Sequence, residues 1–183
     1  MPDLIGTKTL YLGFCGIIDA AGVGRIAAAF NQAVNDQFDC VHLTFSSPGG
    51  AAADGVFLYN HIRSLPIRTV IHNSGTVASV ATTIYAAADF RTACDASIFM
   101  IHPVQAQANG AHHSLQSVLD SALAEEDRID AILKERSAIP QDVLERRRSV
   151  DVFFTAKNAL EYGLVHEIGD FTLPAGNKVF HLG

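Results

Sequence analysis

Five hydroxyl side chains cluster in the segment from Asn73 to Asp89, and one of them could act as a nucleophile. They are Ser74, Thr76, Ser79, Thr82 and Thr83. The apolar residues 67–72 predict a strand, Gly75 is expected to break it, and the small residues that follow predict a helix. Ser79 should then lie in the first helical turn, where free N–H groups stabilise negative charge. Compact hydroxyls that allow close helix packing are the competing interpretation.

A serine becomes a good nucleophile only when a base takes its proton and a third group orients that base. Of the eight histidines, His102 is best placed, because it ends the apolar strand 97–101 at the edge where the Ser79 helix should begin. The candidate orienting acid is Asp151. The apolar residues 152–154 after it should bury its surroundings, and a buried carboxylate needs a partner. From the residues alone, a packing role for Ser79 and a solvated Asp151 stay open.

Two backbone N–H groups could bind an oxyanion near such a serine. The Pro48-Gly49-Gly50 loop follows the strand expected over 41–45, and its glycines let the chain approach a ligand closely. The loop could also hold a phosphate or be a plain turn. The second candidate is the N–H of Val80, directly after Ser79. No histidine has the spacing to cysteines or carboxylates that is typical of a metal site, so no metal and no cofactor is predicted.

Strands alternate with helices along the chain, which indicates an α/β protein with parallel strand pairing. The expected strands are residues 9–14, 41–45, 67–72, 97–101 and 164–168, with two short ones within 171–182. The expected helices begin at Asp19, after Gly50, after Gly75, at Ser114, at Pro140 and at Thr155. In such folds the chemistry collects where strands end and helices begin.

The composition restricts the class of protein. The 183 residues suit one domain, and 49% hydrophobic residues against 17% charged ones predict surface buried between subunits. A net charge of −6 argues against nucleic acid as a partner, and the basic run 146–148 is interpreted as a solvated or subunit-facing helix end. Three isolated cysteines, no signal-like N-terminus and no apolar span predict a cytoplasmic protein without a membrane partner.

Four motifs occur in an order that resembles the ClpP family, the proteolytic subunits of the ATP-dependent Clp protease. They are FSSPGG, SGTVASV, FMIHP and DVFFTAKNALEYGLVHEI, and the similarity runs from about Leu10 to Ile168. The resemblance implies that Ser79 is the nucleophile, His102 the general base and Asp151 the acid that orients it. It also implies that the N–H groups of Gly50 and Val80 form the oxyanion hole.

The resemblance also implies a fold and an assembly. The fold is the ClpP/crotonase-like layered fold of repeated β-β-α units with a protruding handle helix. We expect a single peptidase domain over residues 1–183, a handle helix at about 114–137 and a short C-terminal tail at 170–183. The implied protein is a serine endopeptidase for peptides or unfolded proteins, built as a homo-oligomeric ring (a heptamer or a double ring). An ATP-driven unfoldase is a candidate partner, although the segment before the matched region is short for docking one.

Two other functions are compatible with this sequence. One is a non-catalytic ClpP-like ring subunit, in which the three side chains are present but misaligned. The other is a crotonase-type acyl-CoA enzyme, because that superfamily shares the fold and the two-N–H oxyanion hole. A crotonase-type site would not require Ser79, His102 and Asp151 to converge.

Overall fold

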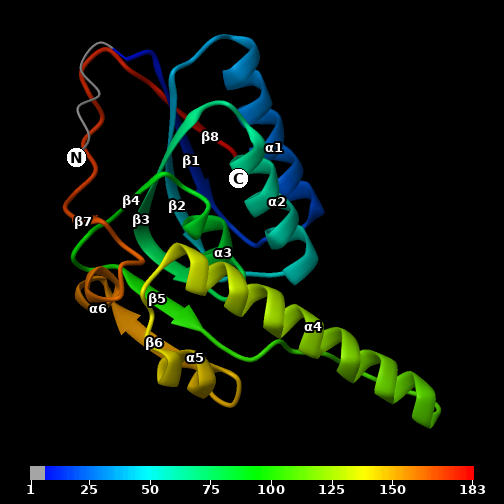
Figure 1. Ribbon diagram of the computed structural model, residues 1–183. Helices are drawn as coiled ribbons and strands as arrows, with labels where there is room; N and C mark the ends of the chain where they lie inside the picture. The colour runs from blue at the N-terminus through cyan, green and yellow to red at the C-terminus, as the bar shows by residue number, and fades with distance from the viewer. Residues whose placement is uncertain (1–6) are drawn as a thin grey trace.

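The computed structural model describes residues 7–183. Its strands are β1 Thr9–Cys15, β2 Cys40–Ser47, β3 Arg68–Ala78, β4 Phe90–Ala93, β5 Ile98–Ile101, β6 Val152–Thr155, β7 Glu167–Ile168 and β8 Val179–His181. Its helices are α1 Ala20–Asn35, α2 Ala52–Ser64, α3 Ala81–Ala86, α4 His112–Arg136, α5 Gln141–Arg147 and α6 Ala156–Glu161 (Figure 1). The alternation of strands and helices confirms the α/β class.

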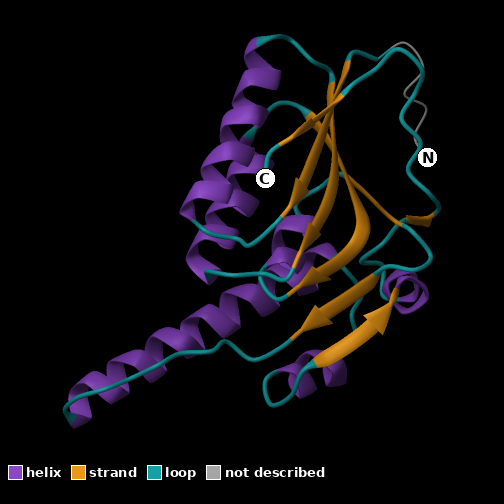
Figure 2. Ribbon diagram, turned by 180° about the vertical axis from the view of Figure 1, so that it is seen from behind, coloured by secondary structure: helices purple, strands orange, loops and turns teal. Residues whose placement is uncertain are grey.

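One sheet positions all the other elements. Its strand order is β6-β5-β3-β2-β1-β8, and β4 and β7 extend it from β3. All the pairings are parallel except that of β5 with β6. Helices α1 and α2 cover one face of the sheet, while the chain before β8 runs past the other side (Figure 2). Because β2, β3 and β5 run parallel to one another, their carboxyl ends lie together at one edge.

Local sequence accounts for two of the helix starts. Asp19 caps α1, because its carboxylate accepts the N–H of Gly22 at 2.7 Å. Thr155 caps α6 in a capping box with Asn158. The caps expected at Asp19 and Thr155 are confirmed. Pro140, expected to open a helix, is the N-cap of α5.

Strand β3 differs from the expectation. Gly75 was predicted to end this strand, but β3 continues to Ala78. Residues 70–73 pair with β4, whereas residues 76–78 pair with β5. Gly75 therefore marks the point where the strand changes neighbours, and the predicted break was wrong. Strands β4 and β6 were not predicted, and only Glu167–Ile168 of the expected strand 164–168 is in a strand.

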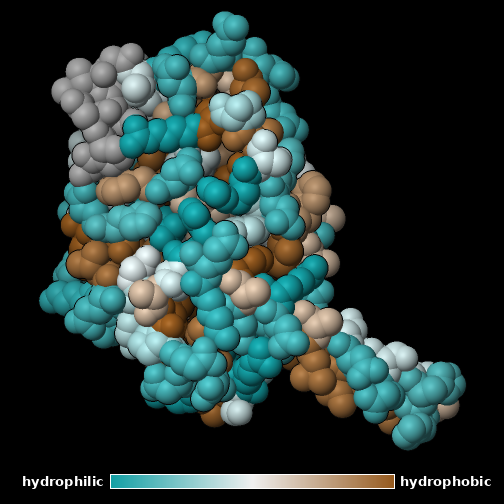
Figure 3. Space-filling model, in the orientation of Figure 1, coloured by the Kyte–Doolittle hydropathy of each residue, from teal (hydrophilic) through white to brown (hydrophobic). Residues whose placement is uncertain are grey.

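Helix α4 projects away from the sheet (Figure 1). Near its C-terminal end, Ile129 and Leu133 are buried in the core. Apolar side chains also gather along the projecting part (Figure 3), where Leu115, Leu119 and Leu123 are exposed and recur at a spacing of four residues. A spacing of four places these leucines on one side of the helix, where neighbouring elements of the chain do not cover them.

The C-terminal segment returns to the sheet. Strand β8 adds in parallel to β1, and the N–H of Leu182 donates to the carbonyl of Gly13 at 2.8 Å. Before β8, the ring of Phe171 lies 4.7 Å from that of His42. Two short strands were expected in 171–182, and β8 is the one that forms there. The segment thus covers one open edge of the sheet.

Two buried histidines predict a loss of stability in acid. Burial lowers the pKa of His42 from 6.5 to about 4, with a smaller effect of the neighbouring His72, and burial also lowers the pKa of His72. These two side chains therefore bind a proton more readily in the unfolded chain than in the folded protein. The stability contributed by neutral His42 is present above about pH 6.5 and is lost as the pH falls towards 4. We expect the urea midpoint to fall over that range, and to fall less steeply for His42→Phe.

The matched control is His113→Gln, because His113 is exposed on α4. In His113→Gln the urea midpoint should fall with pH as steeply as in the parent protein, since the carboxylates contribute equally in the two proteins. Parallel midpoint curves for His42→Phe and the parent protein would contradict the assignment.

Candidate active site

Ser79 stands at a sharp turn between β3 and α3. Its φ is +58°, in the left-handed region that non-glycine residues rarely adopt. The Ser79 N–H donates to the carbonyl of Met100 at 2.8 Å, and its carbonyl accepts the hydroxyl of Thr82 at 2.7 Å. The expectation that Ser79 lies in the first helical turn was therefore wrong, because β3 extends further and α3 starts only at Ala81. The turn holds the serine in a strained conformation, a feature that often accompanies function.

The Pro48-Gly49-Gly50 loop packs directly against this turn. A Cβ added at Gly49 would lie 2.5 Å from the Cβ of Ser79, and one added at Gly50 would lie 2.0 Å from the carbonyl oxygen of Ile18. Both glycines also have positive φ, +97° and +156°. No side chain fits at either position: Gly49 allows the loop to approach Ser79, and Gly50 allows it to pack against the backbone of Ile18.

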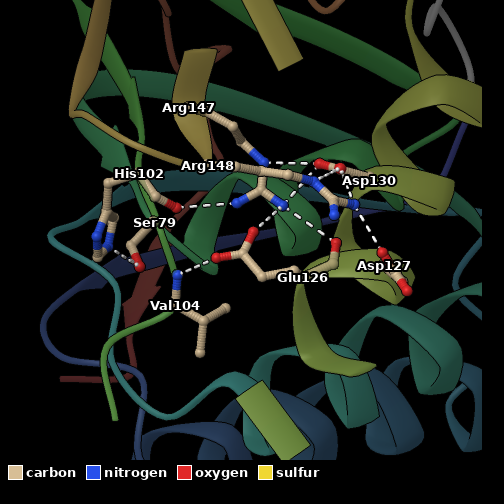
Figure 4. A network of polar contacts seen from close by, with 8 residues as sticks. All are labelled: Ser79, His102, Val104, Glu126, Asp127, Asp130, Arg147 and Arg148. Atoms are coloured by element: carbon tan, nitrogen blue, oxygen red, sulfur yellow. Dashed lines mark hydrogen bonds and ion pairs between the residues drawn. The ribbon is translucent and has the colours of Figure 1, made fainter. Parts of the chain in front are cut away.

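His102 lies where the sequence placed it, directly after β5. Its Nε2 is 2.7 Å from the Oγ of Ser79 (Figure 4). At this distance the imidazole can take the hydroxyl proton, which is the step that makes a serine nucleophilic. The structure brings these two predicted residues together.

The two predicted oxyanion donors lie beside the same pair. The N–H of Ile18 donates to the carbonyl of Gly49 and the N–H of Ala51 donates to the carbonyl of Ile18, each at 2.8 Å. Between these bonds, the N–H of Gly50 has no acceptor within residues 7–183, and the same holds for Val80. Both residues line a cavity of about 400 Å³ together with Ser79 and His102. Two free amide donors at a cavity suit a developing negative charge.

Asp151 does not join the pair through a hydrogen bond. Its side chain is exposed, and across the described chain no hydrogen bond connects it to His102. The surroundings are less buried than the sequence suggested, because Phe153 is 64% exposed. The register still brings the backbones close, since Ile101 pairs with Val152 and the next pair would be His102 with Asp151. The orienting role of Asp151 stays a prediction.

Sequence reasoning missed Arg147. It was grouped with its basic neighbours as a solvated or subunit-facing helix end, but its side chain is only 1% exposed. Its Nη1 donates to the carbonyl of His102 at 2.9 Å (Figure 4). The helical spacing could have indicated this burial, because Arg147 follows the buried Val143 by four residues and Leu144 by three.

A serine hydroxyl bonded to an imidazole, beside two unpaired amides at the carboxyl edge of a sheet, is typical of α/β serine hydrolases. The model of the Clp protease family matches residues 25–171, and the chain belongs to this family. Its mixed α/β sheet and helices fit the ClpP fold that the sequence predicted.

The chain is also similar to a curated protein, ATP-dependent Clp protease proteolytic subunit 2 of Pseudomonas aeruginosa. The two are 27% identical over 142 residues, which cover 74% of this chain and 71% of that protein. The resemblance to the ClpP family is therefore confirmed. Within residues 7–183, no helix combines the length and the apolar character needed to cross a membrane.

The strained turn generates a prediction about stability. Ser79→Gly and Ser79→Ala both remove the hydroxyl, but only glycine adopts a φ of +58° without strain. We expect Ser79→Gly to be more stable than Ser79→Ala by about 1 kcal/mol in urea unfolding. Equal stability of the two variants would show that the turn is unstrained.

Proposed function

We propose that this protein is a serine endopeptidase that hydrolyses peptide bonds in peptides or unfolded proteins. The observation that carries the proposal is the 2.7 Å contact between Ser79 Oγ and His102 Nε2. Membership of the Clp protease family supports the peptidase class. No cofactor or metal enters the proposed chemistry.

The proposed reaction is acyl transfer. Ser79 Oγ attacks the peptide carbonyl while His102 Nε2 takes the hydroxyl proton. The N–H groups of Gly50 and Val80 hold the tetrahedral oxyanion, and His102 then protonates the leaving amine. Water hydrolyses the acyl-enzyme by the same route, with His102 again acting as the base. Asp151 would orient the imidazole and stabilise the imidazolium once its carboxylate turns towards His102.

The proposed working form is a homo-oligomeric ring in the cytoplasm, a heptamer or a double ring. The exposed leucines on α4 support it, because apolar side chains on one side of a projecting helix are suited to contact between subunits. An ATP-driven unfoldase is a candidate partner, as the name of the Pseudomonas aeruginosa relative contains the word ATP-dependent.

One observation favours a second candidate. The exposed position of Asp151, without a bond to His102, is what a non-catalytic ring subunit would show. A crotonase-type acyl-CoA enzyme has no such support, since that chemistry does not need the contact between Ser79 and His102.

The first test replaces the nucleophile. Ser79→Ala should abolish labelling by a fluorophosphonate probe and lower the hydrolysis of a fluorogenic peptide by about 10³-fold or more. Ser74→Ala is the control, because Ser74 is an exposed hydroxyl of β3, the strand that ends just before Ser79, and the substitution should leave both rates unchanged. Equal labelling of the parent protein and Ser79→Ala would overturn the proposal.

The second test addresses the acid. Asp151→Asn should lower kcat by at least about 10-fold with a small change in KM, because an orienting carboxylate acts mainly in the transition state. Asp95→Asn is the control, since Asp95 is also exposed but lies before β5. An unchanged kcat in Asp151→Asn would mean that Ser79 and His102 act as a dyad.

A further inference from the structure

The segment that carries His102 has little regular structure of its own. The chain leaves β5 at Ile101 and forms neither helix nor strand until α4 begins at His112. Pro103 follows His102 and has no N–H to donate. The position of the imidazole therefore depends on how the backbone on either side of Pro103 is held.

Side chains from two helices hold both sides of Pro103. The carbonyl of His102 accepts Nη1 of Arg147, from α5, at 2.9 Å. The N–H of Val104 donates to Oε1 of Glu126, from α4. Figure 4 shows these contacts converging on the loop from one side.

The two anchors are themselves fixed to each other and to Asp130. Nη2 of Arg147 lies 2.8 Å from Oε2 of Glu126, an ion-pair distance, although that oxygen accepts no hydrogen bond from residues 7–183. Nη2 of Arg147 also donates to the main-chain carbonyl of Glu126 at 3.1 Å. Nε of Arg147 donates to Oδ1 of Asp130 at 2.7 Å. The guanidinium thus has partners in several directions and little freedom to rotate.

We propose that Arg147, Glu126 and Asp130, here called the anchor cluster, are positioning residues that hold the His102 loop so that its imidazole meets Ser79. The catalytic consequence rests on the proposed peptidase function. The mechanical part, that the cluster fixes the backbone around Pro103, stands on the contacts alone.

Stability alone does not explain the anchor cluster. Its side chains are between 1% and 8% exposed, and burying charges costs several kcal/mol per ion before the attraction between them is counted. Apolar side chains of similar volume often serve packing equally well or better. What an apolar side chain cannot supply is a donor for the His102 carbonyl and an acceptor for the Val104 N–H.

Arg148 provides an internal comparison. It also binds Asp130, with Nε 2.7 Å from Oδ2, and it pairs with Asp127 at 2.7 Å. Its side chain is 37% exposed, and none of its hydrogen bonds or ion pairs reaches the His102 loop. Adjacent arginines on one helix thus share a carboxylate, but only Arg147 contacts the backbone that carries the imidazole.

The experiment compares Arg147→Met with Arg148→Met in the full chain. Both substitutions remove a guanidinium from the same carboxylate, but only the first releases the His102 carbonyl. We expect Arg147→Met to lower kcat and the rate constant of fluorophosphonate labelling by about 10-fold or more, because it removes charge-assisted bonds at a buried site. KM should stay within about 2-fold, and Arg148→Met should stay within about 2-fold of the parent protein in every constant.

A second variant covers the case in which Arg147→Met fails to fold. Glu126→Gln keeps an oxygen that can accept the Val104 N–H, whereas Glu126→Leu does not. Glu126→Gln should therefore retain more activity than Glu126→Leu at similar thermal stability. The proposal fails if the activity of every variant merely follows its melting temperature and Arg147→Met is as active as Arg148→Met. The anchor cluster would then have a structural role only.

Hydrogen exchange separates this proposal from the peptidase function. In deuterium exchange followed by mass spectrometry, the peptide that contains Val104 should exchange about 10-fold faster in Arg147→Met and at the parent rate in Arg148→Met. This readout needs no activity. If labelling of the parent protein does not depend on Ser79, the peptidase proposal fails while the exchange result still decides whether the cluster fixes the loop. Unchanged exchange in Arg147→Met overturns the inference.

Discussion

The hydrogen bond between Ser79 and His102 depends on the pairing of β3 with β5. Ala78 lies opposite Met100, and the N–H of Ser79 continues the ladder by bonding to the Met100 carbonyl. The next pair in this register would be Ser79 with Ile101, so His102 lies one residue beyond the position opposite Ser79. In a regular ladder the side chains of Ser79 and His102 would then point to opposite faces, and the left-handed turn at Ser79 interrupts that alternation. The pairing of β3 with β5 brings the two backbones together, and the turn at Ser79 lets its hydroxyl meet the imidazole.

The sequence predicted much of this site because local chemistry decides much of it. Three features follow from residue type and short-range spacing: the glycine loop beside Ser79, the caps at Asp19 and Thr155, and the strand before His102. Together with the order of the motifs, these features were enough to indicate the α/β class and the family.

The errors have a common physical origin in long-range contacts. Gly75 does not end β3, because β5 arrives from more than twenty residues away to pair with residues 76–78. A glycine alone cannot report that a new neighbouring strand follows. The burial of Arg147 depends in the same way on carboxylates of α4, and the exposure of Asp151 depends on which side of β6 remains uncovered.

The buried histidines His42 and His72 are accommodated differently from the buried Arg147. His42 and His72 lie among aromatic rings, where burial disfavours the cationic form, so they pack as neutral rings. Arg147 is equally buried but has two carboxylates within ion-pair distance. A neutral imidazole ring fills space and can accept or donate a hydrogen bond only at its two ring nitrogens. A paired guanidinium still has donors to direct elsewhere, and Arg147 directs one of them at the backbone that carries His102.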